Sequence, residues 1–231
     1  RDLFVELEFR RLSDQFASAA QSSRDETQGQ ASVEIEDRET DYAIIDSLAD
    51  VELLVAELRA AGSFSIAAES SHEDPLRGEL VGLAVSVESG IARYLPFAHT
   101  QPFALIFEGE VSNETRTLPG VGDPKLEFLR DLLEDPAVGK SGHDLKQAAL
   151  VLATSGVTLA GFEVDAMIAS YVLDPGKRGH DLRALSMETF SHKPLDRSDV
   201  TGSGRSKVLF AEVPLERASE YLCSAVDLAG R

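Results

Sequence analysis

A single acid follows a buried strand in the segment FSIAAESSH, residues 64–72. The apolar start of this segment predicts the end of a strand, and Glu69 comes where that strand should meet solvent. Cleavage of a phosphodiester with two magnesium ions needs several carboxylates, which hold the metals roughly 3.5 to 4 Å apart. The usual sequence footprint is Asp-x-Glu at a strand end. Here the first position of that footprint is Ala67, so the strand delivers one acid where two are expected.

Other polar residues near these segments favour structural roles. Asp165 opens the segment DAMIASYVL and suits a helix N-cap, where its carboxylate accepts from free backbone amides. The pairs His143-Asp144 and His180-Asp181 suggest metal ligands, but no third type of ligand is clustered with them. We therefore predict caps and loop contacts at these two pairs.

Two further features suggest chemistry that their context does not support. The segment GSGRSK, residues 202–207, resembles a phosphate cradle, but it lacks the G-x-x-x-x-G-K-[ST] spacing and no strand precedes it. A flexible loop is the favoured interpretation. Cys223 is the one cysteine of the chain, so no internal disulfide is possible and a reducing, intracellular setting is expected.

The segments that must position these residues alternate between helix and strand. A helix capped by Asp50 or a neighbour is expected to run through Ala61, with Leu53, Leu54 and Leu58 inward. Short connectors favour an antiparallel meander for three strand-like runs: Phe64–Ala68, Leu80–Val87 and Ile91–Phe97. A less regular stretch spans Thr100–Gly122. A short strand is expected at 137–142, and further helices at 124–135, 144–156, 165–173, 181–190 and 214–230.

The chain divides into three parts by composition. Residues 1–16 predict an amphipathic helix, residues 17–41 a mobile polar linker, and residues 42–231 a globular domain. The first residue is Arg1, and Arg231 ends the chain inside a predicted helix, so we expect a fragment of a longer protein.

The charge of the chain is strongly acidic, with 40 acidic against 22 basic residues and a net charge of -18. Such a surface repels phosphate backbones, so the isolated chain is expected to bind nucleic acid weakly or not at all. No apolar run approaches the roughly 20 residues that span a bilayer, and no signal peptide is evident. We expect no association with membranes.

Several segments, taken in order and spacing, resemble bacterial family A DNA polymerases of the DNA polymerase I type. Residues 64–99 resemble the first exonuclease motif and its hairpin, and RDLFVELEFRRL at the start is similar to the segment that leaves the 5′ nuclease domain. The resemblance continues through VGKSGHDLKQAALVLATSGV, FEVDAMIASYVLDP, HDLRALSMETFSHK and ASEYLCSAVD. It covers nearly the whole chain from about Tyr42. It implies an α/β fold, in which a ribonuclease H-like mixed sheet is flanked by helices.

The proofreading site of that family, of the DEDDy type, can be carried over residue by residue. In the first motif, Asp-x-Glu, the positions are Ala67 and Glu69. The second, Asn-Leu-Lys-Tyr-Asp, reads DLKQA here and ends on Ala148. The third, Tyr-x-x-x-Asp, has Tyr221 but ends on Ala225. By this resemblance three of the four carboxylates are missing, and Glu69 and Tyr221 are the vestigial catalytic residues.

These losses predict a vestigial, catalytically inactive 3′-5′ exonuclease domain. Magnesium gives up its water reluctantly and would find one carboxylate, so no metal or cofactor is expected here. By resemblance, the parent enzyme would synthesise DNA with magnesium in a polymerase domain, which is the expected partner. DNA would be bound through that parent, in the cytoplasm of a bacterium and at its nucleoid.

Three alternatives stay open. An active nuclease could use Asp74, Asp144 or Asp227 as substitute metal ligands. However, Asp144 lies one helical turn before Ala148, and Asp227 would face away from Ala225. The alanines could be engineered, but Ala68, Gln147 and Ser224 also depart from the family pattern, which favours drift. A protein-binding module is the third. Individually, Glu69 could be a solvated acid at a strand end, and Tyr221 a packing residue.

Overall fold

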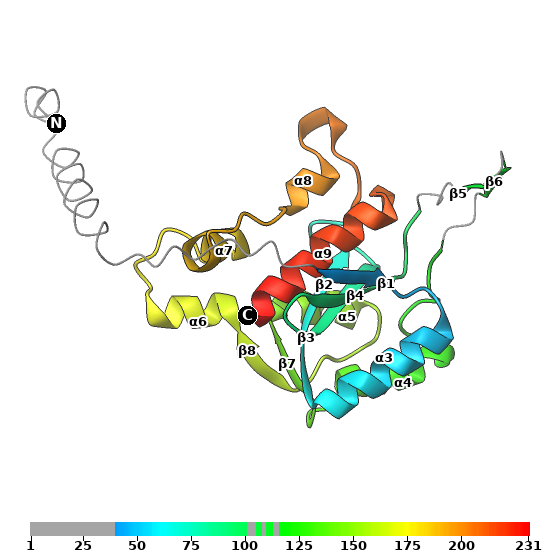
Figure 1. Ribbon diagram of the computed structural model, residues 1–231, viewed down its shortest axis with the longest axis horizontal. Helices are drawn as coiled ribbons and strands as arrows, with labels where there is room; N and C mark the ends of the chain where they lie inside the picture. Colours follow the sequence, from blue (N-terminus) through cyan, green and yellow to red (C-terminus); the bar gives the residue numbers. More distant parts are fainter. Residues whose placement is uncertain (1–39, 101–104, 108–109, 113–115) are drawn as a thin grey trace, which may run out of the picture. The chain divides into compact units, whose positions relative to one another are not determined.

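The computed structural model describes residues 40–100, 105–107, 110–112 and 116–231 (Figure 1). The predicted helix at 1–16 lies outside the described residues, and so does nearly all of the predicted linker at 17–41. The domain predicted from residue 42 onward begins, in the structure, with a strand at Asp41.

A mixed sheet with the strand order β1-β4-β3-β2-β7-β8 forms the centre of the domain. The strands β2, β3 and β4 pair antiparallel, as the predicted meander requires. β1 is parallel to β4, β7 is parallel to β2, and β8 is parallel to β7. The bounds are β1 Asp41–Ile44, β2 Ser63–Ser70, β3 Leu80–Glu88, β4 Ile91–Pro96, β7 Gly139–Gly142 and β8 Phe162–Asp165.

Four strands are absent from the predicted pattern. β1 and β8 have four residues each, which is too short for an alternation of polar and apolar residues to be distinctive. A separate two-stranded hairpin, β5 Leu105–Phe107 and β6 Glu110–Ser112, lies in the stretch expected to be less regular.

The helices are α3 Leu48–Ala61, α4 Glu127–Glu134, α5 Leu145–Thr154, α6 Ala166–Leu173, α7 Leu182–Phe190, α8 Arg197–Thr201 and α9 Leu215–Gly230. All but α8 were predicted. α4 follows a 3-10 turn at Pro124–Leu126 and ends before Pro136, and a left-handed Gly156 follows α5. None of the described helices is long and apolar enough to cross a membrane.

The helix α3 differs from its prediction in its cap, which is Ser47 and not Asp50, and in the orientation of one side chain. Ser47 is its N-cap and accepts a hydrogen bond from the backbone nitrogen of Asp50 at 3.2 Å. Leu54 and Leu58 are buried as expected, but Leu53 is 70% exposed, so its predicted inward orientation is wrong. The buried stripe is Val51, Leu54, Val55 and Leu58, which follows the helical spacing that Leu53 falls outside.

Helices cover both faces of the sheet, so the domain has two cores (Figure 1). Ile66 and Ala68 of β2 pack with α3, α4 and α5, while Ala67 lies on the other face with α9. This follows from the alternation of side chains along a strand. The observed architecture, a mixed six-stranded sheet with flanking helices, confirms the predicted ribonuclease H-like fold class.

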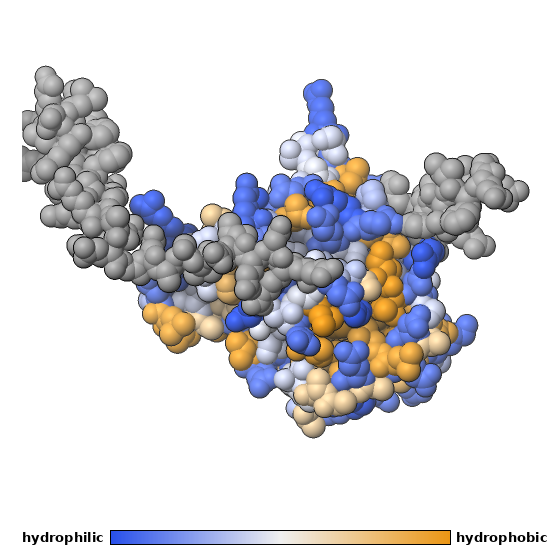
Figure 2. All heavy atoms as spheres, viewed as in Figure 1, coloured by the Kyte–Doolittle hydropathy of each residue, from blue (hydrophilic) through white to orange (hydrophobic). Residues whose placement is uncertain are grey.

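The helix α6 contributes little to either core. Ile168, Tyr171, Val172 and Leu173 are all more than half exposed. In Figure 2, apolar side chains gather at the lower left of the molecule, over α6. The neighbouring edge strand β8 exposes Phe162 and Val164 as well.

Candidate functional site

One pocket brings together all five positions to which the resemblance carries the nuclease motifs. It has a volume of about 280 Å³ and lies at the carboxyl end of β2. β2 supplies Ala67 and Glu69, α5 supplies Ala148, and α9 supplies Tyr221 and Ala225. Three elements that are distant in sequence therefore converge on one site.

Glu69 is buried, with 4% of its surface exposed. The strand β2 runs on to Ser70, and Glu69 lies opposite Gly82 of β3 before a register shift. The expectation of a solvated acid at the strand end is therefore wrong. The strand is longer than predicted, and Arg197 at the start of α8 contacts its last two residues.

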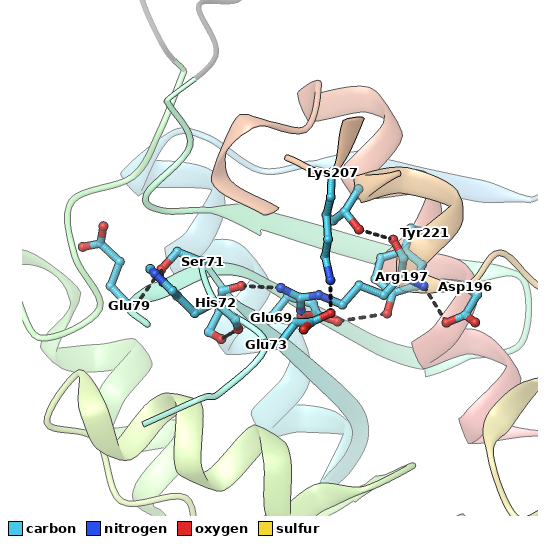
Figure 3. A network of polar contacts seen from close by, with 11 residues as sticks. Glu69, Ser71, His72, Glu73, Glu79, Asp196, Arg197, Lys207 and Tyr221 are labelled. Atoms are coloured by element: carbon cyan, nitrogen blue, oxygen red, sulfur yellow. Dashed lines mark hydrogen bonds and ion pairs between the residues drawn. The ribbon is translucent and has the colours of Figure 1, made fainter. Parts of the chain in front are cut away.

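Both carboxylate oxygens of Glu69 are engaged by side chains (Figure 3). The Tyr221 hydroxyl donates to Oε1 at 2.9 Å, and Nη1 of Arg197 donates to Oε2 in an ion pair. The other terminal nitrogen of Arg197 donates to the backbone oxygen of Ser70 at 3.1 Å. A buried charge of this kind is tolerated because it is paired and hydrogen-bonded.

Arg197 is the first residue of α8, and sequence reasoning missed it. Its guanidinium lies 5.3 Å from the ring centre of Phe210, and its side chain is 18% exposed. Burial lowers the pKa of Arg197, and the nearby Tyr221 opposes that shift. Arg197 stands 128 residues from Glu69, and the segment PLDRSDV has no spacing that predicts this contact.

Tyr221 packs against Phe210 and also donates a hydrogen bond to Glu69. Its ring meets that of Phe210 edge to face, with the centroids 5.9 Å apart. Burial raises the pKa of Tyr221 to about 12, so its hydroxyl keeps its proton at neutral pH and remains a donor to Glu69.

The remaining acids of the pocket are helix caps. Asp144, Asp181 and Asp196 line it, and each accepts a hydrogen bond from a backbone nitrogen at the start of α5, α7 and α8, respectively. Asp144 holds its position with a left-handed backbone, φ 55°. Asp196 also forms an ion pair with Arg183 at 3.7 Å.

The residues present do not fit a pair of magnesium ions. Magnesium prefers oxygen ligands, and the side chains of Ala67, Ala148 and Ala225 offer none. Glu69 already has a cationic partner in Arg197. Over the described part of the chain, no group of three or more histidine, cysteine and acidic side chains could hold a metal ion.

Two of the three alternative ligands lie away from this pocket. Asp74 pairs with Arg77 at 3.3 Å beside a different pocket. Asp227 is 2% exposed and accepts from the Tyr42 hydroxyl at 2.8 Å and from Arg231 at 2.8 Å. It thereby ties β1 to the end of α9. Asp144 alone of the three lines the pocket with Glu69.

The prediction of an N-cap at Asp165 is confirmed and extends to a second helix. Its carboxylate accepts from the nitrogens of Met167 and Ile168 at the start of α6, at 2.9 and 3.3 Å. It also accepts from the nitrogens of Asp144 and Leu145 at the start of α5, at 3.2 and 2.8 Å. One side chain thus joins the beginnings of two helices.

The two histidine-acid pairs make the loop contacts predicted for them. Nε2 of His143 lies 2.9 Å from the backbone oxygen of His180, and Nδ1 of His180 lies 2.8 Å from the Ser170 hydroxyl. The GSGRSK segment contains a 3-10 turn at Gly204–Ser206 and ends on Lys207, which pairs with Glu73.

Comparison with solved structures identifies the fold. The chain is similar to Brucella melitensis NrnC bound to pGG, with a TM-score of 0.56, 18% identity, and coverage of 84% of this chain and 78% of that one. It is also similar to a structure of the POL domain of Pol1 from M. smegmatis in complex with DNA primer-template and dNTP. That match has a TM-score of 0.54, 21% identity, and covers 81% of this chain and 26% of the other. The fold is that of ribonuclease H-like exonucleases.

Sequence comparison finds similarity to DNA polymerase I. Residues 118–224 match the family model described as DNA polymerase I, ribonuclease H-like domain. The DNA polymerase I of Pseudomonas aeruginosa is 27% identical over 231 residues, which cover 99% of this chain and 24% of that protein. The described domain therefore has a ribonuclease H-like exonuclease fold, and its sequence is similar to that domain of DNA polymerase I. The chain spans about a quarter of the length of this relative.

Proposed function

We propose that this domain has lost nuclease activity and serves as a structural module of a DNA polymerase I-type enzyme in DNA replication and repair. One observation carries the proposal. Of the five side chains that the resemblance places at the nuclease motifs, Glu69 alone is a carboxylate, and all five line the same pocket. Ala67, Ala148 and Ala225 provide no ligand for the metals that the chemistry needs.

The state of Tyr221 supports the same proposal. In a working site of this type, the tyrosine would orient a water that a metal activates. Here its hydroxyl donates to Glu69 at 2.9 Å and is held protonated by burial. Glu69 and Tyr221 therefore act as a buried hydrogen-bonded pair within the fold.

The wider role follows from the relatives. The Pseudomonas aeruginosa relative is a DNA polymerase I, and the mycobacterial structure holds a DNA primer-template and dNTP. By extension, a polymerase domain of the same parent chain is the partner of this module, and magnesium is needed by that domain. DNA is engaged through the parent, in the bacterial cytoplasm at the nucleoid.

The rival functions have less support. For a living nuclease with substitute ligands, Asp144 is the one candidate of three that lines the pocket, and its carboxylate already caps α5. Deliberate replacement of the aspartates and a protein-binding role both remain rival hypotheses, and no contact among the described residues of the pocket favours either.

The test is incubation of the domain with a 3′-end-labelled single strand in magnesium, in manganese and in chelator. We expect no metal-dependent shortening above that of a Glu69→Gln variant purified in parallel. Because both preparations carry the same contaminants, a contaminating nuclease would shorten the strand equally in each. Metal-dependent shortening by the unmodified chain that the Glu69→Gln variant lacks would overturn the proposal.

A further inference from the structure

We propose that Arg197 has taken the place of a metal cation beside Glu69, and that the former site is now a clasp that fastens residues 196–213 onto β2. This inference rests on the proposed absence of a metal. It goes further by naming the residue that replaces the metal and the structural work that the replaced site performs.

The guanidinium of Arg197 contacts both the end of β2 and the ring of Phe210. One terminal nitrogen pairs with Glu69, and the other donates to the backbone oxygen of Ser70, so the guanidinium grips the end of β2 at two points. Phe210, at the far end of the fastened segment, lies beneath the guanidinium at 5.3 Å. Arginine suits this position because its planar fork presents several donors and keeps its charge.

Electrostatics explain why a cation is required at this point. The side chain of Glu69 is 5% exposed, and an unpaired carboxylate buried to that extent would be strongly destabilising. In a metal site the ions would supply the balancing charge. In this chain the Arg197 side chain carries the balancing positive charge. A divalent ion would have to displace its guanidinium to reach Glu69.

A second ion pair in the same segment provides an internal comparison. Lys207 pairs with Glu73, in the connection that follows β2, so both pairs link the same two parts of the chain. The side chains of Lys207 and Glu73 are 40% and 68% exposed, against 18% and 5% for Arg197 and Glu69. Exposed pairs contribute little, whereas breaking a buried pair is costly. The clasp should therefore depend on Arg197 and not on Lys207.

The first experiment is a pair of double-mutant cycles read by thermal unfolding. We expect Arg197→Met and Glu69→Gln each to lower the Tm by about 6 °C or more. The double variant should fall little further than either single variant, because the two side chains act together. In the control cycle, Lys207→Met and Glu73→Gln should each shift the Tm by at most about 2 °C, and their effects should add.

The clasp would be refuted if the Tm losses of Arg197→Met and Glu69→Gln were additive in the double variant. It would also be refuted if the Arg197 and Glu69 variants lost no more Tm than the Lys207 and Glu73 variants. If Arg197→Met does not fold, Arg197→Lys replaces it, since lysine keeps the charge and loses the fork. That variant should show a smaller loss of Tm that still couples to Glu69→Gln.

The second experiment tests the replacement of the metal by calorimetric titration with manganese alone. Ala67→Asp with Ala225→Asp restores two carboxylates at the partly buried positions and spares the buried Ala148. We expect manganese to bind at least tenfold more tightly when Arg197→Ser is added to this pair of changes. Equal affinity with and without Arg197 would refute the replacement. The nuclease assay on the unmodified chain decides the proposed function separately.

Discussion

His99 is a buried histidine whose charge is coupled to the stability of the fold. It is 6% exposed, its Nε2 lies 2.7 Å from the Tyr94 hydroxyl, and its ring centre lies 6.2 Å from that of Phe210. Burial lowers the pKa of His99 to about 4. The folded protein therefore holds the neutral imidazole at neutral pH.

Acidification should destabilise the domain through this residue. The unfolded chain binds a proton on His99 near pH 6.5, whereas the folded state resists protonation until about pH 4. The contribution of the neutral His99 is thus complete above pH 6.5 and is lost as the pH falls towards 4, by up to about 3 kcal/mol. Urea unfolding at several pH values measures it. His99→Gln should flatten this part of the profile, and an unchanged slope in that variant would contradict the assignment.

The sequence predicted site residues where a family motif specifies their spacing. It missed those that no motif contains. The resemblance directed attention to Glu69 and Tyr221, and the structure joins them by a hydrogen bond. It gave no sign of Arg197, because an ion pair between residues 128 positions apart leaves no periodic pattern. The burial of Glu69 was missed for the same reason, since the covering segment is distant in sequence.

At the scale of elements, Asp165 joins the starts of α5 and α6 through one carboxylate. The sequence predicted the cap of α6, because an aspartate before an apolar helical segment is a local signal. The cap of α5 depends on the parallel pairing of β7 with β8, which brings Gly142 opposite Asp165. No local pattern contains that information.

Loss of the Asp165 carboxylate, which caps two helices, should lower the free energy of unfolding more than loss of a cap that serves one helix. Each cap contributes about 1 kcal/mol, so Asp165→Ala should lower the free energy of unfolding by about 2 kcal/mol or more. Asp181→Ala is the matched control, because Asp181 caps α7 alone. Asp165→Asn keeps an oxygen and should lose less than Asp165→Ala. Denaturant unfolding decides the comparison, and equal losses for Asp165→Ala and Asp181→Ala would rule out the double cap.

At the scale of the whole molecule, the net charge of -18 opposes contact with nucleic acids. Proteins that hold DNA without sequence preference do so by neutralising phosphates with lysine and arginine. Much of the basic content of the described domain is already paired with acids, as for Arg197, Arg183 and Arg231. A phosphate backbone would therefore compete with these acids for the basic side chains.

We expect the isolated chain to bind a fluorescent single strand more weakly than about 10⁻⁴ M at physiological salt, the weak end for non-specific binders. Fluorescence anisotropy measures this directly. Lowering the salt should not strengthen the interaction, because the net charge is repulsive. Saturable micromolar binding that tightens at low salt would show that the domain holds DNA by itself.

The sequence alone determined the parts of this protein that depend on local pattern or on motif order. Strand alternation and helix signals predicted β2 to β4 and most helices, and the order of the motifs predicted the ribonuclease H-like fold. The alanines at positions 67, 148 and 225, where the resemblance implies carboxylates, are also read directly from the sequence. Tertiary structure decided what surrounds Glu69. Only folding brings α8 and α9 over the end of β2, and burial then makes Arg197 the partner that this carboxylate requires.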